Sequence, residues 1–521
     1  MGGGGLRSSS VIPATERESP FIKFCMYLIV ALLFFFFTAA AFAESVVGAE
    51  HNRNLRQLDN STFLMDYHRQ TVGDERAFFT YPRRNTEFVR NFETTERNAL
   101  IYYADSIGAG ADAHRFALAA SPVVGLDYRG GKSLGDTIWP GVDGGLYLRG
   151  YADSVDFDLD ARIYAEKHSA AKPKSFDGEV FDVQTEDGNA GADYVSYARY
   201  RAHLGFNYAW VRASLARDVL HWGPGFYNNL AFNQFALPYN MVNVDMTFGP
   251  LRVFSVYADL RVNSWSYSKD NLNDRNLYAH RYELALGDLT IGMSEIQVLY
   301  NENKPWLFVP VIPLFIEKGN YTERVNNGAL SFDMNYRLFN AARLYGEFFL
   351  DDMESPMAVY ENKYSNNRWA AMLGMQLAHD VYVGKRLLQL GSIAEIARVE
   401  PYTYCHYDTA QAQMAHLGMP LGNPNGPNSL AVDWTLYSQL NLSGLSNVFL
   451  GMHQKWLWKG SDAGSSIDDP YKTVRKRFVH DAPMHYSLAP AFSYRGAHVA
   501  FSGEYGFFDD PYVNVRVSFV L

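Results

Sequence analysis

The residues best suited to bind a ligand lie at positions 217–240, RDVLHWGPGFYNNLAFNQFALPYN. A Gly-Pro-Gly run at 223–225 favours a tight, stiff turn there. Around this turn stand rings and hydrogen-bonding groups, namely those of His221, Trp222, Tyr227, Asn228 and Asn229. An aromatic ring can stack on the C–H face of a sugar while amides bond its hydroxyls. The stretch therefore predicts a carbohydrate site, or a loop that folds inward, packs on itself and narrows a pore. The two interpretations are compatible.

Two acidic residues and one cysteine are further candidates for chemistry. Asp351 and Asp352 end a predicted strand, where carboxylates can bind Ca²⁺ or hydrogen-bond sugar hydroxyls. The alternative is a solvated acidic loop that also includes Glu354. Cys405 is the one cysteine outside the N-terminal leader, which excludes an intrachain disulfide and a cysteine-based zinc site in the mature chain. We expect neither a metal nor a cofactor.

Signals for an enzyme are few. The sequence has no His-Glu-x-x-His motif, and its histidines are scattered. A hydrolase with Ser, His and Asp side chains at a barrel rim remains a hypothesis, because such sites have no fixed local spacing. We expect a non-enzymatic protein without catalytic residues.

A strict alternation of apolar and polar residues predicts β-strands, and these strands would position the candidate side chains. In residues 155–165, VDFDLDARIYA, apolar residues alternate with polar ones. A period of two places the two sets on opposite faces of one β-strand. Charged side chains such as Asp156, Asp158, Asp160 and Arg162 can cost up to about 2–4 kcal/mol facing lipid at the middle of a membrane, but little facing an aqueous lumen. The pattern therefore predicts a membrane strand with its apolar face toward the bilayer.

The same alternation recurs along the chain and predicts an all-β fold. We expect a transmembrane antiparallel β-barrel of about 18 strands over residues 116–521, since bacterial barrels use even strand numbers. The predicted strands are 116–128, 142–152, 155–167, 196–208, 211–218, 241–249, 250–262, 277–287, 289–299, 325–337, 341–350, 367–379, 385–401, 429–441, 446–458, 484–495, 496–508 and 511–521.

The connections between these strands support a barrel. Long connections alternate with short ones, as in outer-membrane barrels, where tight turns face the periplasm and long loops face outward. The connection at 509–510 is an exception, because it is short although the alternation predicts a long connection there. The final strand, VNVRVSFVL at 513–521, resembles the amphipathic sorting signal of outer-membrane proteins. We therefore expect location in the outer membrane of a Gram-negative-type bacterium, in contact with its lipid.

The first 115 residues precede the barrel. An apolar run at 25–40, followed by Ala-Phe-Ala, predicts a cleaved signal peptide over 1–43. Residues 44–115 lack period-two strands and are expected to form a periplasmic or plug segment, or a loosely ordered leader. Within them, 98–107 is compatible with a short helix. The net charge of −10 argues against nucleic acid as a partner.

One apolar stretch lies in a long connection. Residues 304–316, KPWLFVPVIPLFI, are too short and too rich in proline to span a bilayer as a helix. We expect an outer loop packed at the barrel mouth, or an exposed apolar patch for a partner.

Three stretches together resemble the Wzi family of capsule-assembly outer-membrane proteins. They are the Trp-Gly-Pro-Gly stretch within 217–240, LYGEFFLDD at 344–352, and PLGNPNGPNS at 420–429, which follows an aromatic and histidine-rich segment. The resemblance implies an eighteen-stranded barrel that binds surface polysaccharide and helps attach capsule. Residues 44–115 depart from the family because they lack its compact helical pattern. The glycan-binding candidates are Arg217, His221, Trp222, Tyr227, Asn228, Asn229, Asp351, Asp352, His406, Asn423 and Asn425.

The sequence thus leads to two main functional hypotheses. The first is a non-enzymatic outer-membrane barrel that binds capsular or other surface polysaccharide and supports capsule assembly or attachment. The second is a diffusion porin for sugars or other small solutes, because eighteen strands leave a channel unless loops fold in.

Overall fold

The structure is a computed structural model. Its compact unit Ser45–Leu521 contains every described residue, and the expected signal peptide lies outside them. The described residues are 60–73, 80–81, 99–107, 114–131, 139–167, 179–180, 194–261, 275–300, 302–320, 326–352, 367–406, 412–443, 446–470, 476–496, 498–508 and 511–520.

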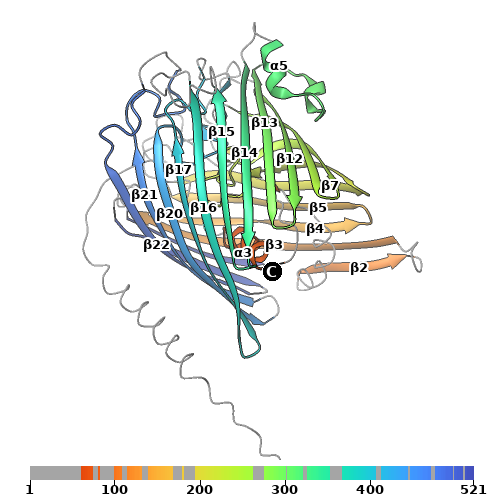
Figure 1. The fold of residues 1–521 in the computed structure, drawn as a ribbon. Helices are drawn as coiled ribbons and strands as arrows, with labels where there is room; N and C mark the ends of the chain where they lie inside the picture. The colour runs from red at the N-terminus through yellow and green to blue at the C-terminus, as the bar shows by residue number, and fades with distance from the viewer. Residues whose placement is uncertain are drawn as a thin grey trace, which may run out of the picture. The chain divides into compact units, whose positions relative to one another are not determined.

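Eighteen antiparallel strands form a closed barrel, which β24 completes by pairing with β3 (Figure 1). This confirms the predicted fold and strand number. The strands are β3 (His114–Gly131), β4 (Trp139–Ala152), β5 (Val155–Lys167), β7 (Tyr194–Tyr208), β8 (Val211–Asp218), β10 (Tyr239–Phe248), β11 (Leu251–Leu260), β12 (Arg275–Leu286), β13 (Leu289–Tyr300), β14 (Asn326–Leu338), β15 (Ala342–Asp352), β16 (Arg368–Val383), β17 (Arg386–Val399), β20 (Ser429–Ser443), β21 (Ser446–Lys459), β22 (Met484–Arg495), β23 (Val499–Gly506) and β24 (Tyr512–Val520).

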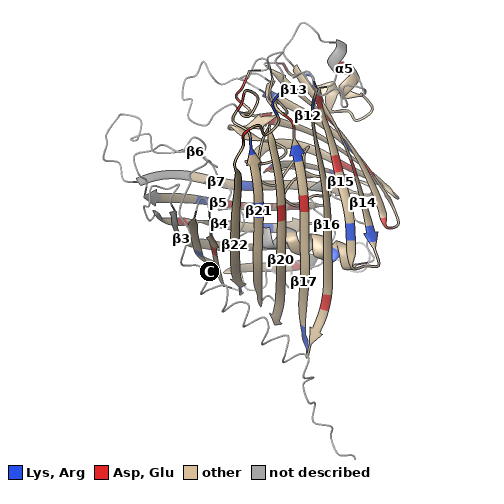
Figure 2. Ribbon diagram, turned by 60° about the vertical axis from the view of Figure 1, so that its left-hand side comes forward, with Lys and Arg blue, Asp and Glu red and all other residues tan. Residues whose placement is uncertain are grey.

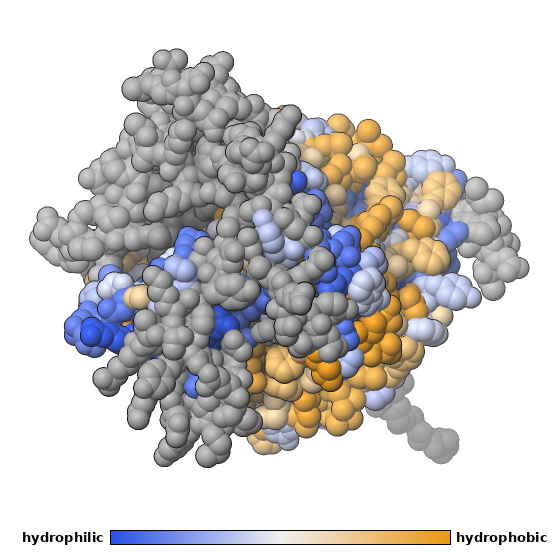
Figure 3. Space-filling model, turned by 90° about the horizontal axis from the view of Figure 1, so that it is seen from above, coloured by the Kyte–Doolittle hydropathy of each residue, from blue (hydrophilic) through white to orange (hydrophobic). Residues whose placement is uncertain are grey.

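The two faces of the wall differ as the alternation predicts. On β5, Asp156 is buried and accepts hydrogen bonds from Arg212 (2.9 Å) and Asn207 (2.7 Å), whereas Ile163 of the opposite face is 59% exposed. Charged positions are isolated along otherwise uncharged strands (Figure 2), and apolar residues gather on the outside of the wall (Figure 3). The outer face is therefore suited to lipid.

The two ends of the barrel differ in their connections. At the end that we call the turn end, strand pairs are joined by two or three residues, such as 209–210 and 249–250. Ala209 and Gly249 adopt positive φ there, as tight hairpins require. At the opposite end, the loop end, connections are longer, as at 219–238. The connection 507–511 between β23 and β24 is the short exception that the sequence indicated.

Residues 98–107 were wrongly expected to be helical. Residues 101–107 form strand β2 (Ile101–Ile107), which pairs with β3 over residues 114–120. β24 pairs with β3 only from Val123 onward, so the N-terminal part of the same edge of β3 is free to pair with β2. A long-range pairing that local sequence does not reveal therefore decides the conformation of this segment.

Short elements complete the described chain. Helix α3 (Asn60–Val72) packs against β15 and β16, and Figure 1 draws it within the curve of the barrel. Among the residues described, no helix is long and apolar enough to cross a bilayer. The remaining elements are β1 (Thr80–Tyr81), β6 (Glu179–Val180), β9 (His221–Trp222), η4 (Pro305–Phe308), α5 (Leu314–Asn320), β18 (Ala415–His416) and β19 (Met419–Pro420).

The apolar stretch at 304–316 packs on the barrel as expected, but on the outside of its wall. Leu307 and Leu314 are buried against Tyr278 of β12 and Leu299 of β13. The hydroxyl of Ser255 donates to the carbonyl of Phe308. The apolar side chains of this segment that remain exposed are Trp306, Val309, Val311, Phe315 and Ile316.

Candidate functional site

The loop at 219–238 folds into the barrel and is buried along its whole length. Glu395 of β17 accepts hydrogen bonds from the backbone N–H groups of Phe226 (2.5 Å), Tyr227 (2.9 Å) and Asn228 (2.9 Å). Glu347 of β15 accepts hydrogen bonds from the backbone N–H groups of Leu230 (2.7 Å) and Ala231 (2.9 Å), which lie slightly further along the same loop. Two wall carboxylates thus satisfy five backbone donors that would otherwise be buried without partners.

The Gly-Pro-Gly run forms the sharp turn that its composition predicts. Gly223 has φ +117°, a conformation that side chains rarely allow. The N–H of Gly225 donates to Asn229 Oδ1 at 2.7 Å, and Arg343 of β15 donates to the carbonyl of Pro224 at 2.7 Å. The turn is therefore fastened both to its own loop and to the wall.

Helix α3 closes over this turn. Its Tyr67, which is fully buried, hydrogen-bonds through its hydroxyl to His221 and to the carbonyl of Gly225 (3.1 Å). Asn229 Nδ2 also lies 2.8 Å from His221 Nε2. His68, the next helix residue, contacts Asp380 Oδ1 of β16 at 2.6 Å, while burial lowers the pKa of this histidine despite that carboxylate. Helix α3, which precedes the barrel in the sequence, thus holds the loop at 219–238 in place.

Asn228 joins the loop to the Pro/Gly segment at 420–428. Its amide donates to Asp433 Oδ2 of β20 at 2.8 Å. Its carbonyl oxygen accepts from Asn423 (3.1 Å) and Asn425 (3.3 Å). The neighbouring ring of Tyr227 stacks on His453 of β21, with centroids 4.4 Å apart. One side chain therefore links two loops and the wall.

The segments at 400–406 and 412–422 pack on the loop from the loop end. Tyr404 donates its hydroxyl to the carbonyl of Leu230 (2.8 Å), and its N–H donates to Asp351 Oδ2 (2.7 Å). Burial raises the pKa of this tyrosine far above its usual value, so it remains a neutral donor. A Cβ on Gly422 would lie 1.9 Å from the carbonyl oxygen of Leu230, which only glycine permits. We call 219–238, 400–406, 412–428 and α3 together the interior assembly.

The structure brings most of the predicted site residues together, but their side chains are buried within the protein and not exposed on its surface. Among the candidates, those buried in or against the interior assembly are His221, Trp222, Tyr227, Asn228, Asn229, Asp351, His406, Asn423 and Asn425. Arg217 stands apart on the outer wall, over the ring of Tyr200. Asp352 ends β15 opposite Arg368, and its side chain lies outside the described ones. A direct role of the buried residues in sugar binding remains a prediction.

Sequence reasoning missed the groups that hold the assembly. Glu347, Glu395 and Asp433 were not singled out, although each is an isolated acidic residue at an inward position of an apolar strand, which is a usable signal. Tyr67 was missed because nothing near it in the sequence indicates its contact with His221, 154 residues away. In the described part of the chain, no cluster of three or more acidic, histidine or cysteine side chains is placed to hold a metal ion.

The other half of the inward face is charged. Arg516 of β24 donates to Asp127 (2.8 Å) and Asp143 (2.7 Å) of the neighbouring strands. Arg162 of β5 pairs with Asp160 at 2.6 Å, and the Asp160 side chain is 37% exposed. Ion pairs therefore line the inward face of β3, β4, β5 and β24, and among these side chains Asp160 is the most exposed.

A closed wall of eighteen strands with an apolar exterior, short turns at one end and long loops at the other defines an outer-membrane β-barrel. Comparison with models of known families gives no match, and comparison with curated proteins gives none. Among solved structures, the chain is similar to Wzi of Escherichia coli, described as a carbohydrate-binding outer-membrane β-barrel involved in group 1 capsule assembly. That likeness has a TM-score of 0.53 at 14% identity and covers 92% of this chain and 100% of the other.

Weaker likenesses are to two proteins of another bacterium. OpdK of Pseudomonas aeruginosa aligns with a TM-score of 0.39 and 10% identity, over 80% of this chain and 100% of the other. OccK2 of the same organism, solved with glucuronate, gives 0.40 and 10%, over 78% and 96%. At these identities the comparisons establish the barrel fold and no family.

Proposed function

We propose that this barrel binds surface polysaccharide and supports assembly or attachment of a capsule at the outer membrane, without catalysing a reaction. The observation that carries the proposal is the interior assembly, in which aromatic and amide-rich loops are held rigid by wall carboxylates. A rigid platform loses little entropy when a flexible glycan binds. The carbohydrate binding described for Wzi supports the same function.

In this proposal, the buried candidates position the loops and the residues above them contact the glycan. Polar groups lie at the loop end between β21 and β22. His480 Nδ1 lies 3.1 Å from Asp481 and 3.7 Å from Asp462, and all three side chains are at least one-third exposed. Exposed carboxylate and imidazole groups suit hydrogen bonding to sugar hydroxyls. We propose that the glycan binds at this end of the barrel.

The test is retention of polysaccharide on cells. Cells lacking the protein should shed surface glycan into the medium, and the wild-type chain should restore its attachment. A double variant, Asp462→Ala with Asp481→Ala, should reach the membrane normally but restore attachment poorly. Full attachment in cells that lack the protein would overturn the proposal.

A diffusion porin is the second candidate, because the charged side of the lumen is suited to a hydrated passage. Arg162 and Arg516 lie on that side, away from Glu347 and Glu395, which hold the loop. Planar-bilayer recording separates the two functions. A large, steady conductance of the wild-type chain favours the porin, and silence favours the glycan-binding barrel.

A further inference from the structure

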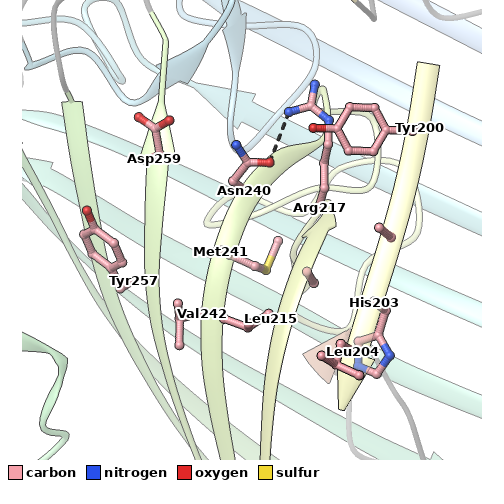
Figure 4. Close-up of a pocket in the computed structure, with 12 residues that line it drawn as sticks. Tyr200, His203, Leu204, Leu215, Arg217, Asn240, Met241, Val242, Tyr257 and Asp259 are labelled. Carbon is pink, nitrogen blue, oxygen red and sulfur yellow. Dashed lines mark hydrogen bonds between the residues drawn. The ribbon is translucent and has the colours of Figure 1, made fainter. Parts of the chain in front are cut away.

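A pocket of about 460 Å³ lies at the barrel wall where β7, β8, β10 and β11 meet (Figure 4). β8, with 8 residues, is much shorter than β7, with 15. Eight residues at about 3.3 Å each span roughly 26 Å along the strand. Because barrel strands tilt by about 35–45°, the wall is no taller here than the apolar band of a membrane barrel, about 25 Å.

The register sorts the outward-facing lining of this pocket into two rows. The row nearer the loop end is polar: Arg217 pairs with Asn240, and Asn240 with Asp259. The next row toward the turn end is apolar: Leu204 pairs with Leu215, and Leu215 with Val242. Leu204 and Leu215 are about half exposed, so the apolar row is open to whatever surrounds the wall.

Arg217 has no carboxylate partner among the described residues. Its guanidinium lies 4.6 Å from the ring centre of Tyr200 and donates one hydrogen bond, at 3.3 Å, to Asn240 Oδ1 (Figure 4). Its Nε is buried and has no hydrogen-bond partner in the described part of the chain. By contrast, five other wall arginines pair with acidic residues, namely Arg212, Arg252, Arg281, Arg337 and Arg516.

Arg217, without a carboxylate partner among the described residues and next to the exposed apolar row, suits a ligand that has both an anionic group and an apolar chain. The planar guanidinium binds phosphate oxygens through two parallel N–H donors. Leucine and valine side chains below it match an acyl chain, and the long loops place this end at the outer leaflet. We propose that this pocket binds a phosphorylated lipid of the outer leaflet, with the phosphate on Arg217 and an acyl chain along Leu204, Leu215 and Val242.

This proposal gives Arg217 a different ligand from the polysaccharide expected from sequence, and it does not depend on the proposed function. A free phosphate ion is a poorer match, because one arginine beside apolar side chains gives it few donors. Asp259, on the far side of the polar row, can accept hydrogen bonds from head-group hydroxyls.

The test uses the purified full chain in nanodiscs, with lipid binding followed by native mass spectrometry. The probes are diphosphoryl lipid A, the same lipid with its phosphates removed, and inorganic phosphate. We expect Arg217→Gln to weaken binding of diphosphoryl lipid A about tenfold, as loss of a charged hydrogen-bonded pair implies. Arg386→Gln removes an exposed positive charge at the turn end and should leave binding unchanged.

One further variant and one control lipid test the two halves of the proposed site separately. Leu204→Trp fills the apolar row without touching Arg217 and should also weaken lipid binding, while heat-modifiable gel mobility verifies that each variant folds. The dephosphorylated lipid should bind weakly to wild type and be insensitive to Arg217→Gln. Equal binding of diphosphoryl lipid A to wild type and Arg217→Gln, or displacement of it by millimolar inorganic phosphate, would overturn the proposal.

Discussion

At the scale of single residues, Asn228 connects the loop at 219–238 to the Pro/Gly segment and to the barrel wall. Asn228→Ala removes a donor to Asp433 and Glu395 and the acceptor for Asn423 and Asn425, so four buried side chains each lose a hydrogen bond. Each buried polar group that is left without a partner costs about 1–3 kcal/mol. We expect the variant to lose at least about 2 kcal/mol of unfolding free energy in urea titration of the refolded barrel.

The matched control is Asn441→Ala, near the turn end of β20. Asn441 is partly exposed and accepts one hydrogen bond, from Gln439. We expect a loss of less than about 1 kcal/mol, because solvent can replace that bond. Equal losses in the two asparagine variants would show that Asn228 is an ordinary polar residue and not the junction of the two loops.

His416 gives the assembly a pH dependence. Burial and the nearby cations Arg217, Arg275 and Arg261 lower its pKa to about 3. Its folded pKa therefore lies below the unfolded value near 6.5, so the unfolded segment binds the proton more readily. Stability from this residue is complete above pH 6.5 and is lost as the pH falls toward 3.

We expect opening of the segment 412–421 to become about tenfold more favourable for each pH unit below 6.5. Hydrogen exchange of these amides, corrected for its intrinsic pH dependence, measures the opening. His416→Gln removes the titrating group, so its corrected opening should vary less with pH. An identical pH profile in wild type and variant would contradict the assignment.

At the scale of elements, the loop at 219–238 and the segment at 412–428 depend on close backbone approach. In Gly422→Ala, the new Cβ would meet the carbonyl oxygen of Leu230 at 1.9 Å, so the two segments must separate. We expect amide exchange to rise throughout 219–238, by at least tenfold, while the strands keep their protection.

Gly503→Ala in β23 is the control for that substitution. Its added Cβ would have its nearest neighbours at 4.0 Å, which is ordinary contact. We expect little change in exchange anywhere in the barrel. If Gly422→Ala behaves like Gly503→Ala, the loop is not held by this packing.

At the scale of the whole molecule, the sequence predicted the wall because lipid and lumen impose opposite demands on alternating residues. Ile163 and Asp156 of β5 illustrate this, one exposed to the exterior and the other paired with Arg212. The same alternation of buried and more exposed positions appears in β14 and β16, so the period of two identifies such strands.

The interior assembly was less predictable, because its contacts join distant segments. The composition of 217–240 indicated an inward-folding loop, but not that Glu395 would receive its backbone donors from 167 to 169 residues away. Helix α3 and strand β2 were missed for the same reason. Each is stabilised by a partner, His221 or β3, that local periodicity cannot identify.

Equilibrium binding of purified surface polysaccharide to the wild-type barrel in nanodiscs tests the central claim most directly. The account predicts saturable binding that is strongly reduced in Asp462→Ala with Asp481→Ala and in Gly422→Ala, all with intact barrels. Absence of saturable binding by a fully folded wild-type barrel, or undiminished binding by both variants, would contradict it.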